Sequence, residues 1–260
     1  MQWLQPAQPA TLHVSVSQVR AFTMCGKKYA YRYVLGVEAE HRATNLVVGS
    51  AVHSALAGFY LDLKGGAEPD PAQVLDHYHA AFDQESQGDP PLLLDDGETA
   101  EEVRAGGERL VRTFLAGVER PELVVAVEQP VRADVIDPES GEVIEEQLLA
   151  YLDAVVEVGG QQVVLEHKTA ARAWSQDQLD FDLQVSLYLA MTGADAVRLQ
   201  VLTKTKVPRL LVYDLRRSER EMSEAVTIVC RVLDAIRAGA FWPSPGWACR
   251  ECEYRRQCRG

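Results

Sequence analysis

The sequence has no apolar run of about 18 residues, the length that a helix needs to cross a bilayer, so no membrane span is predicted. Its first residues lack the basic and apolar segments of a secretory signal peptide, which predicts a cytoplasmic protein. Basic residues are outnumbered, with 26 Lys and Arg against 38 Asp and Glu and a net charge of −12. This balance excludes a protein that coats nucleic acid through bulk charge, although a local basic groove stays possible.

No internal repeat and no low-complexity stretch is visible, so a repeat architecture is not expected. The 260 residues are 47% hydrophobic and 25% charged, which is typical of a globular protein with an ample core. We expect one domain over residues 1–260. Within it, residues 1–120 form a helical region, residues 121–240 a core, and residues 241–260 a cysteine-bearing tail.

Hydrophobic periodicity and turn residues predict helices in the first half and a mixed α/β second half. Helices are expected near residues 15–35, 46–63, 70–84, 100–117, 178–191 and 218–238. Strands are expected near residues 122–136, 143–158, 162–168, 197–203 and 209–214. The predicted fold class is therefore α/β (α+β), with a mixed β-sheet flanked by helices.

Four of the five cysteines suggest a metal centre that joins the two ends of the chain. Cys249, Cys252 and Cys258 have the spacing C-x2-C-x5-C near the C-terminus, and Cys25 lies near the start. Four thiolates bind either a [4Fe–4S] cluster or Zn²⁺, and the spacing alone favours neither. A disulfide or plain free thiols is the simpler alternative. Cys230 lies in an apolar helical run and is expected to be a buried small residue.

A second pattern lies on the strand expected near residues 162–168. Glu166 and Lys168 are two apart and so point to the same side of the strand. A hairpin through Gly159-Gly160 would bring Asp153 close to Glu166. Two carboxylates beside a lysine form a site for a hard metal ion that positions an attacking water. A salt-bridge cluster on a sheet face is the alternative.

Two helical pairs add candidate residues. Gly49 and His53 share one helix face, and Gly49 is expected to permit close packing behind the histidine. Gln184 and Tyr188 also lie four apart on a helix. Taken alone, His53 is a candidate core histidine and Tyr188 a candidate packing residue. Glu128 is expected to be an edge-strand carboxylate, and a contribution to the site is the alternative.

Together these residues resemble the PD-(D/E)XK nuclease signature, and more closely its RecB-like branch with an iron–sulfur cluster. That branch includes CRISPR spacer-acquisition nucleases and AddB-type nuclease domains. The matching segments, in chain order, are Leu12–Tyr33 with Cys25, Gly49-x3-His53, Asp153, Glu166-x-Lys168, Gln184-x3-Tyr188 and the terminal cysteines. The chain departs from the pattern at Gly26, where proline is usual, at Ala150, where glycine is usual, and at His167, where an aromatic residue is common.

The resemblance implies a restriction-endonuclease-like fold and roles for individual residues. Mg²⁺ or Mn²⁺ would be held by His53, Asp153, Glu166 and the carbonyl of His167. Lys168 would orient the attacking water or stabilise developing charge. Gln184 would position Lys168 or the water, and Tyr188 would contact the substrate backbone. The [4Fe–4S] ligands would be Cys25, Cys249, Cys252 and Cys258.

The implied function is metal-dependent hydrolysis of DNA phosphodiester bonds. We expect an exonuclease acting on single-stranded or end-exposed DNA, in repair, recombination or defence against mobile elements. The alternatives are an accessory nuclease of CRISPR spacer acquisition, a catalytically silent iron–sulfur DNA-binding subunit, and a zinc-clipped fold without nuclease activity. A protein partner from a repair, recombination or CRISPR complex is compatible with each. The candidate DNA-binding residues are Lys27, Lys28, Arg32, Lys204 and Lys206.

Overall fold

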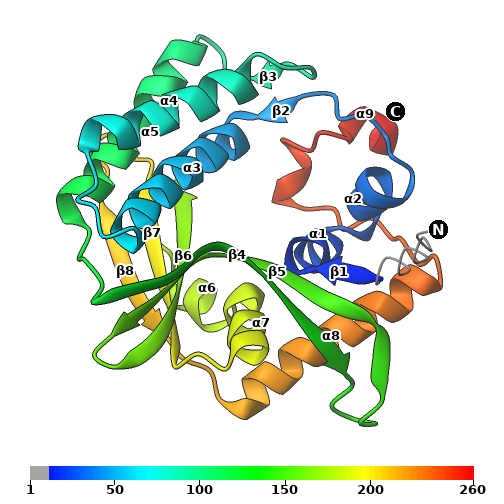
Figure 1. Ribbon diagram of the computed structural model, residues 1–260. Helices are drawn as coiled ribbons and strands as arrows, with labels where there is room; N and C mark the ends of the chain where they lie inside the picture. The colour runs from blue at the N-terminus through cyan, green and yellow to red at the C-terminus, as the bar shows by residue number, and fades with distance from the viewer. Residues whose placement is uncertain (1–11) are drawn as a thin grey trace, which may run out of the picture.

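A central mixed sheet with helices on both faces organises residues 12–260, the part of the chain that the computed structural model describes (Figure 1). Its strands are β1 (His13–Ser15), β4 (Leu123–Ile136), β5 (Val143–Val158), β6 (Gln161–Ala170), β7 (Ala196–Thr203) and β8 (Leu210–Leu215). The order is β1-β5-β6-β7-β8, and β4 pairs with β5. The β1–β5 and β6–β7 pairs are parallel and the others antiparallel. The predicted mixed sheet flanked by helices is confirmed.

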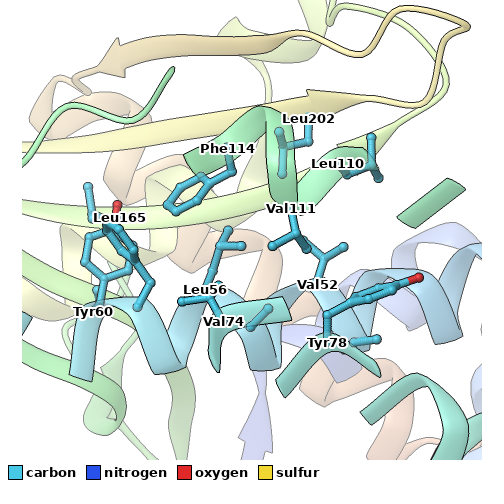
Figure 2. Close-up of a cluster of buried hydrophobic side chains, with 14 of the residues drawn as sticks. Val52, Leu56, Tyr60, Val74, Tyr78, Leu110, Val111, Phe114, Leu165 and Leu202 are labelled. Carbon is cyan, nitrogen blue, oxygen red and sulfur yellow. The ribbon is translucent and has the colours of Figure 1, made fainter. Parts of the chain in front are cut away.

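Helices cover both faces of this sheet because its central strands are apolar on both sides. One face carries α3 (Thr44–Lys64), α4 (Pro71–Ser86) and α5 (Ala100–Gly117). The other carries α1 (Val16–Met24), α7 (Leu183–Thr192) and α8 (Glu219–Arg237). Along β6, Val163 and Leu165 join the first core and Val164 the second, as strand alternation requires. Figure 2 shows the first core, where Tyr60 and Leu56 of α3 approach Phe114 of α5 and Leu165 of β6.

The remaining elements are short. They are α2 (Gly26–Tyr29), a π-helical turn (Ala30–Val34), β2 (Arg42–Ala43), β3 (Leu92–Leu93), α6 (Gln176–Asp180), a 3₁₀ turn (Trp247–Cys249) and α9 (Arg255–Arg259). The helix predicted near residues 15–35 is wrong in its continuity, because extended backbone at Cys25 (φ −164°, ψ 110°) ends α1. The helix predicted near residues 178–191 is also two helices, since Asp182 caps the start of α7. The strand β1 was not predicted.

Helix α3 is long and apolar enough to cross a membrane by length and composition, with a hydropathy of 1.4 over its most apolar window. This differs from the expectation that no segment reaches that standard. Its apolar residues have another explanation, because eight of its side chains are buried in the core against α4, α5 and the sheet. The helix is thus the central element of the first core.

A pair of neighbouring glycines on α5 tests this helical packing. A Cβ built on Gly107 would lie 2.0 Å from the Tyr78 hydroxyl oxygen, whereas one on Gly106 would meet only the end of the Arg109 side chain, at 3.6 Å. We therefore expect Gly107→Ala to destabilise the fold by about 1–3 kcal/mol through overpacking. Gly106→Ala should be neutral or stabilising by up to about 1 kcal/mol, because alanine is the better helix former. Urea unfolding measures both, and equal effects would contradict the close α4–α5 contact.

Candidate active site

The site lies where the pairing of β5 is interrupted. One edge of β5 pairs with β4 along most of its length. On the other edge, residues 147–149 pair with β1 and residues 154–158 pair with β6. Within residues 12–260, residues 150–153 therefore have no strand partner on that edge. Asp153 and Glu166 lie just beyond the last β5–β6 pair, Ala154 with Leu165. Because β5 and β6 are no longer paired beyond this point, side chains from both strands can lie between them.

Asp153 connects the sheet to helix α3. Its Oδ2 accepts a hydrogen bond from the backbone N–H of His167 (2.7 Å), in place of a backbone partner from β5. Its Oδ1 lies 3.1 Å from Nδ1 of His53, near the middle of α3. The structure thus brings together two predicted ligands that are 100 positions apart.

Glu166 and Lys168 belong to a second network that faces helix α7. Lys168 Nζ contacts Glu166 Oε1 and donates to Gln184 Oε1 (2.8 Å). The amide of Gln184 donates to Glu166 Oε1 (3.0 Å) and to the Tyr188 hydroxyl (2.6 Å). That hydroxyl donates to the carbonyl of Tyr151 (3.0 Å), which pairs with β4 but with neither β1 nor β6. Side chains from α7 thereby occupy the interruption and hold the lysine in place.

The imidazole of His167 points into the first core. It is 2% exposed, stacks on Tyr60 with ring centroids 5.5 Å apart, and meets Phe114 edge-on. Burial lowers the pKa of His167 to about 4, so the ring is neutral at pH 7. Its side chain is therefore packed in the core, and only its backbone carbonyl matches the predicted ligand role.

An open cavity of about 490 Å³ adjoins these residues and connects them to solvent. The residues that line it are Asn45, Leu46, Gly49, Ser50, His53, Glu128, His167, Lys168, Thr169 and Lys204. A Cβ on Gly49 would meet only Thr169 Oγ1, at 3.7 Å, so the expectation that close packing requires this glycine is wrong. Its missing side chain instead leaves the cavity wider.

The donor set fits a divalent cation, although the described residues include no three Cys, His, Asp or Glu side chains already arranged to hold one. His53 is bonded to Asp153, and Lys168 to Glu166. Glu166 Oε2 is buried and has no hydrogen-bond partner in the described structure. Two carboxylates, an imidazole and a backbone carbonyl are oxygen and nitrogen donors that Mg²⁺ and Mn²⁺ accept. Such an ion would satisfy the unpartnered oxygen.

The two carboxyl groups have opposite pKa shifts. Burial, followed by the charge of Asp153, raises the pKa of Glu166 to about 7 against the lowering effect of Lys168. Burial alone would also raise the pKa of Asp153, but the hydrogen bond and charge of His53, with the contributions of His167, lower it to about 2. The site thus separates one carboxylate that stays ionised from one that readily takes a proton.

The shift at Glu166 predicts a pH-dependent stability. The unfolded carboxyl titrates near 4.5 and the folded one near 7, so the folded state binds more protons between these values. Stability from this group is therefore lost as the pH rises from about 4.5 to 7, by up to about 3 kcal/mol. We expect the free energy of unfolding, measured with urea in the presence of a chelator, to fall less between pH 5 and pH 8 for Glu166→Gln than for wild type. Glu101→Gln, on the surface of α5, should keep the wild-type slope, and equal slopes for wild type and Glu166→Gln would contradict the shift.

The four predicted cluster cysteines line one small cavity of about 30 Å³ between α1–α2 and the C-terminal tail. All four are free thiols, and Cys25 Sγ accepts a hydrogen bond from the Ser244 amide (3.4 Å). Lys28, Arg255 and Arg259 also line the cavity, while burial raises the pKa of the Cys252 thiol. The four thiols therefore share one cavity, although no three metal-ligating side chains of the described residues are already arranged around a metal position. Cys230 is buried in α8, as predicted.

The two chain ends are held together by further contacts, which Figure 1 shows as α2 lying beside the tail. Lys28 pairs with Glu253 (2.8 Å), the Lys27 amide donates to the Trp242 carbonyl (3.0 Å), and the Tyr31 hydroxyl donates to the Gln257 carbonyl (2.9 Å).

The predicted basic residues do not form one continuous track. Lys204 lines the active-site cavity, and Lys206 follows it in the β7–β8 connection without lining the cavity. Lys28 is engaged by Glu253, Lys27 lies over the ring of Tyr31, and Arg32 lies over Tyr33. Of the five, Lys204 alone is a described lining residue of this cavity, and the three N-terminal residues contact side chains near the chain ends.

Two residues of the site were not among the predicted site residues, although a role for Glu128 was the alternative to a plain edge-strand carboxylate. Arg20 of α1 donates to Gln184 Oε1 (2.5 Å). Glu128 lies in edge strand β4, as expected, but it also lines the cavity beside His53 and has a positive φ of 49°. The register of β4 and β5 puts it opposite Asp153. A positive φ at a non-glycine residue is a backbone strain that often accompanies a functional site, and neither residue has a spacing signal that would have revealed it.

Comparison with known proteins agrees with this geometry. The model of the PD-(D/E)XK nuclease superfamily matches residues 13–259. The chain therefore belongs to the PD-(D/E)XK nuclease superfamily, whose members typically use a divalent metal ion. No curated protein matches it.

Two solved structures are similar to the chain. One is a candidate exonuclease from Eubacterium rectale, with 16% identity, a TM-score of 0.57, and 100% of this chain and 94% of that one covered. The other is SSO0001, with 14% identity, a TM-score of 0.41 and 94% of each chain covered. At this identity the first likeness shows the fold alone.

Proposed function

We propose that this protein is a metal-dependent deoxyribonuclease that hydrolyses phosphodiester bonds at the Asp153–Glu166–Lys168 site. The observation that carries the proposal is that His53 and Lys168 line one solvent-connected cavity, where each is bonded to a carboxyl group, His53 to Asp153 and Lys168 to Glu166. A salt-bridge cluster, the alternative from the sequence, would not leave a buried carboxylate oxygen without a partner.

The residues of the chain divide the chemistry among them. A divalent ion held by His53, Asp153, Glu166 and the His167 carbonyl would polarise the scissile phosphate and lower the pKa of a bound water. Lys168 orients the attacking water and stabilises the charge that develops on the phosphate. Gln184 fixes the direction of the Lys168 ammonium, since its side-chain oxygen accepts from Nζ. The Tyr188 hydroxyl accepts a hydrogen bond from the Gln184 amide and so helps to hold that side chain in place. The expectation that Tyr188 contacts the DNA backbone is wrong, because the side chain is only 3% exposed.

The cysteine cavity is proposed to hold a [4Fe–4S] cluster, which assigns the chain to the RecB-like branch with an iron–sulfur tail. The support is four free thiols around one cavity, together with the C-x2-C-x5-C spacing. Zn²⁺ is the second candidate, because it accepts the same four ligands.

The mode of action is proposed to be exonucleolytic on single-stranded or end-exposed DNA. The fold shared with the candidate exonuclease of Eubacterium rectale is compatible with this mode. The candidate pathways are repair, recombination, CRISPR spacer acquisition and defence against mobile elements. We propose that the protein acts in the cytoplasm with a partner protein from one of these pathways.

An anaerobic preparation tests the proposal directly. The protein is incubated with 5′- and 3′-end-labelled single strands and duplexes, with Mg²⁺, Mn²⁺ or a chelator. We expect cleavage that requires the divalent ion, and a ladder of products from one end would identify the exonucleolytic mode. A preparation that cleaves no DNA with either ion would favour the catalytically silent DNA-binding alternative.

A further inference from the structure

A groove on the α1–α6 side of the catalytic network has aromatic walls that its packing does not explain. Its volume is about 610 Å³. Its lining residues include Arg20, Trp174, Asp177, Phe181, Asp182 and Trp247. Phe181 is 83% exposed and Trp247 is 87% exposed. Isolated exposed apolar residues are ordinary, but three large rings around one groove indicate a binding surface.

The walls come from separate parts of the chain. Trp174 is anchored, since it packs against the small core of Leu179, Leu199 and Val201. Phe181 lies in the short connection between α6 and α7, and Trp247 lies in the tail segment before Cys249. The groove therefore exists only in the folded protein, where these three segments meet around α1.

The groove also adjoins the catalytic residues. Arg20 lines it and donates to Gln184 Oε1 (2.5 Å), and the same oxygen accepts from Lys168 Nζ (2.8 Å). One side chain, that of Gln184, thus separates the groove's arginine from the lysine proposed to act on the phosphate. The groove and the lysine are therefore close enough for one substrate strand to contact both.

Charge distinguishes which part of a substrate fits. Arg20 is the one cation among the lining residues, and Asp177 and Asp182 oppose it. A run of phosphates would be repelled by these carboxylates, whereas the uncharged faces of nucleobases stack on Trp and Phe rings. A base in a duplex is already stacked and paired, so only unpaired bases can enter.

We propose that this groove binds unpaired bases of a single-stranded DNA substrate by stacking on Trp174, Phe181 and Trp247. The inference rests on the proposed nuclease function and adds the surface that would recognise the unpaired bases of its single-stranded substrate.

Fluorescence anisotropy with the full-length protein in a chelator tests this without cleavage. The probes are a labelled single strand, a strand of equal length made of abasic sites, and a duplex. Wild type should bind the normal single strand more tightly than the abasic strand. Phe181→Ala and Trp247→Ala should each bind the normal strand about 5- to 100-fold more weakly. Neither should change its affinity for the abasic strand.

The controls separate the possible failures. Phe181 lies outside the cysteine tail, so its variant reports on the groove even if Trp247→Ala disturbs the tail. Val143→Ala removes another exposed apolar side chain (61% exposed) in β5, outside the groove, and should bind like wild type. If wild type cleaves DNA but the ring variants bind as wild type does, or weaken equally on both strands, the groove inference is wrong and the nuclease function stands. If wild type neither binds nor cleaves any probe, both are wrong. Ring variants that alter self-association rather than binding would assign the groove to a second copy of the chain.

Discussion

Lys168→Ala is expected to reduce DNA cleavage by at least about 100-fold while the protein folds as wild type does. The Lys168 side chain is 20% exposed and lies at the edge of the cavity, where it contacts Glu166 and Gln184. Its removal deletes the cation that contacts Glu166, a proposed metal ligand, at the edge of the cavity that would receive the phosphate. The fold should tolerate the loss, because Glu166 already has a raised pKa and can take up a proton once its partner is gone.

Asp153→Ala and Glu166→Ala should abolish cleavage for a different reason, which a second measurement separates. Both variants lose a proposed metal ligand, whereas Lys168→Ala keeps all of them. We therefore expect Mn²⁺ to raise the melting temperature of wild type and of Lys168→Ala, and to have little effect on Asp153→Ala. Lys64→Ala, at the exposed end of α3, is the matched control and should be fully active. Normal cleavage by Lys168→Ala, Glu166→Ala or Asp153→Ala would show that the site is wrongly assigned.

The central geometry of this site could be predicted from the sequence because it depends on short-range rules. A tight turn at Gly159-Gly160 and the antiparallel register bring Asp153 beside Glu166, and strand alternation puts Lys168 on the same side as Glu166. Helical spacing likewise puts Gln184 and Tyr188 on one face, where they are hydrogen bonded to each other.

The remaining features depend on contacts between distant segments. The parallel pairing of β1 with β5 creates the interruption in which Asp153 lies, and a three-residue strand has no periodic signal. Arg20 reaches Gln184 only because α1 packs beside α7. The break between α1 and α2 at Cys25 follows from the docking of the tail, where the Ser244 amide donates to the Cys25 sulfur. Local propensity alone favours one continuous helix there.

The same tail gives the second large effect: loss of any cluster cysteine should destabilise the protein, and Cys25→Ser most of all. Cys25 is the one thiol of the four from the N-terminal segment, so a centre that includes it closes a loop of more than 200 residues. By analogy with a disulfide, closing such a loop restricts the unfolded chain by on the order of 5 kcal/mol, and the ligand bonds add to this. For a chain of this length, that change lowers the melting temperature by on the order of 10 °C.

Three outcomes distinguish the candidate centres. Cys25→Ser, Cys249→Ser, Cys252→Ser and Cys258→Ser should each lose the brown colour of an anaerobic preparation and unfold at a lower temperature. Cys230→Ala should do neither to a large extent, because its thiol is buried in α8 away from the cavity. Stoichiometric zinc in a strictly anaerobic preparation would show that the four cysteines bind Zn²⁺ and that the cluster assignment is wrong. If the protein carries no metal and all four thiols titrate freely, the contacts of Lys28 with Glu253 and of Tyr31 with Gln257 alone hold the chain ends together, and the metal centre is wrong.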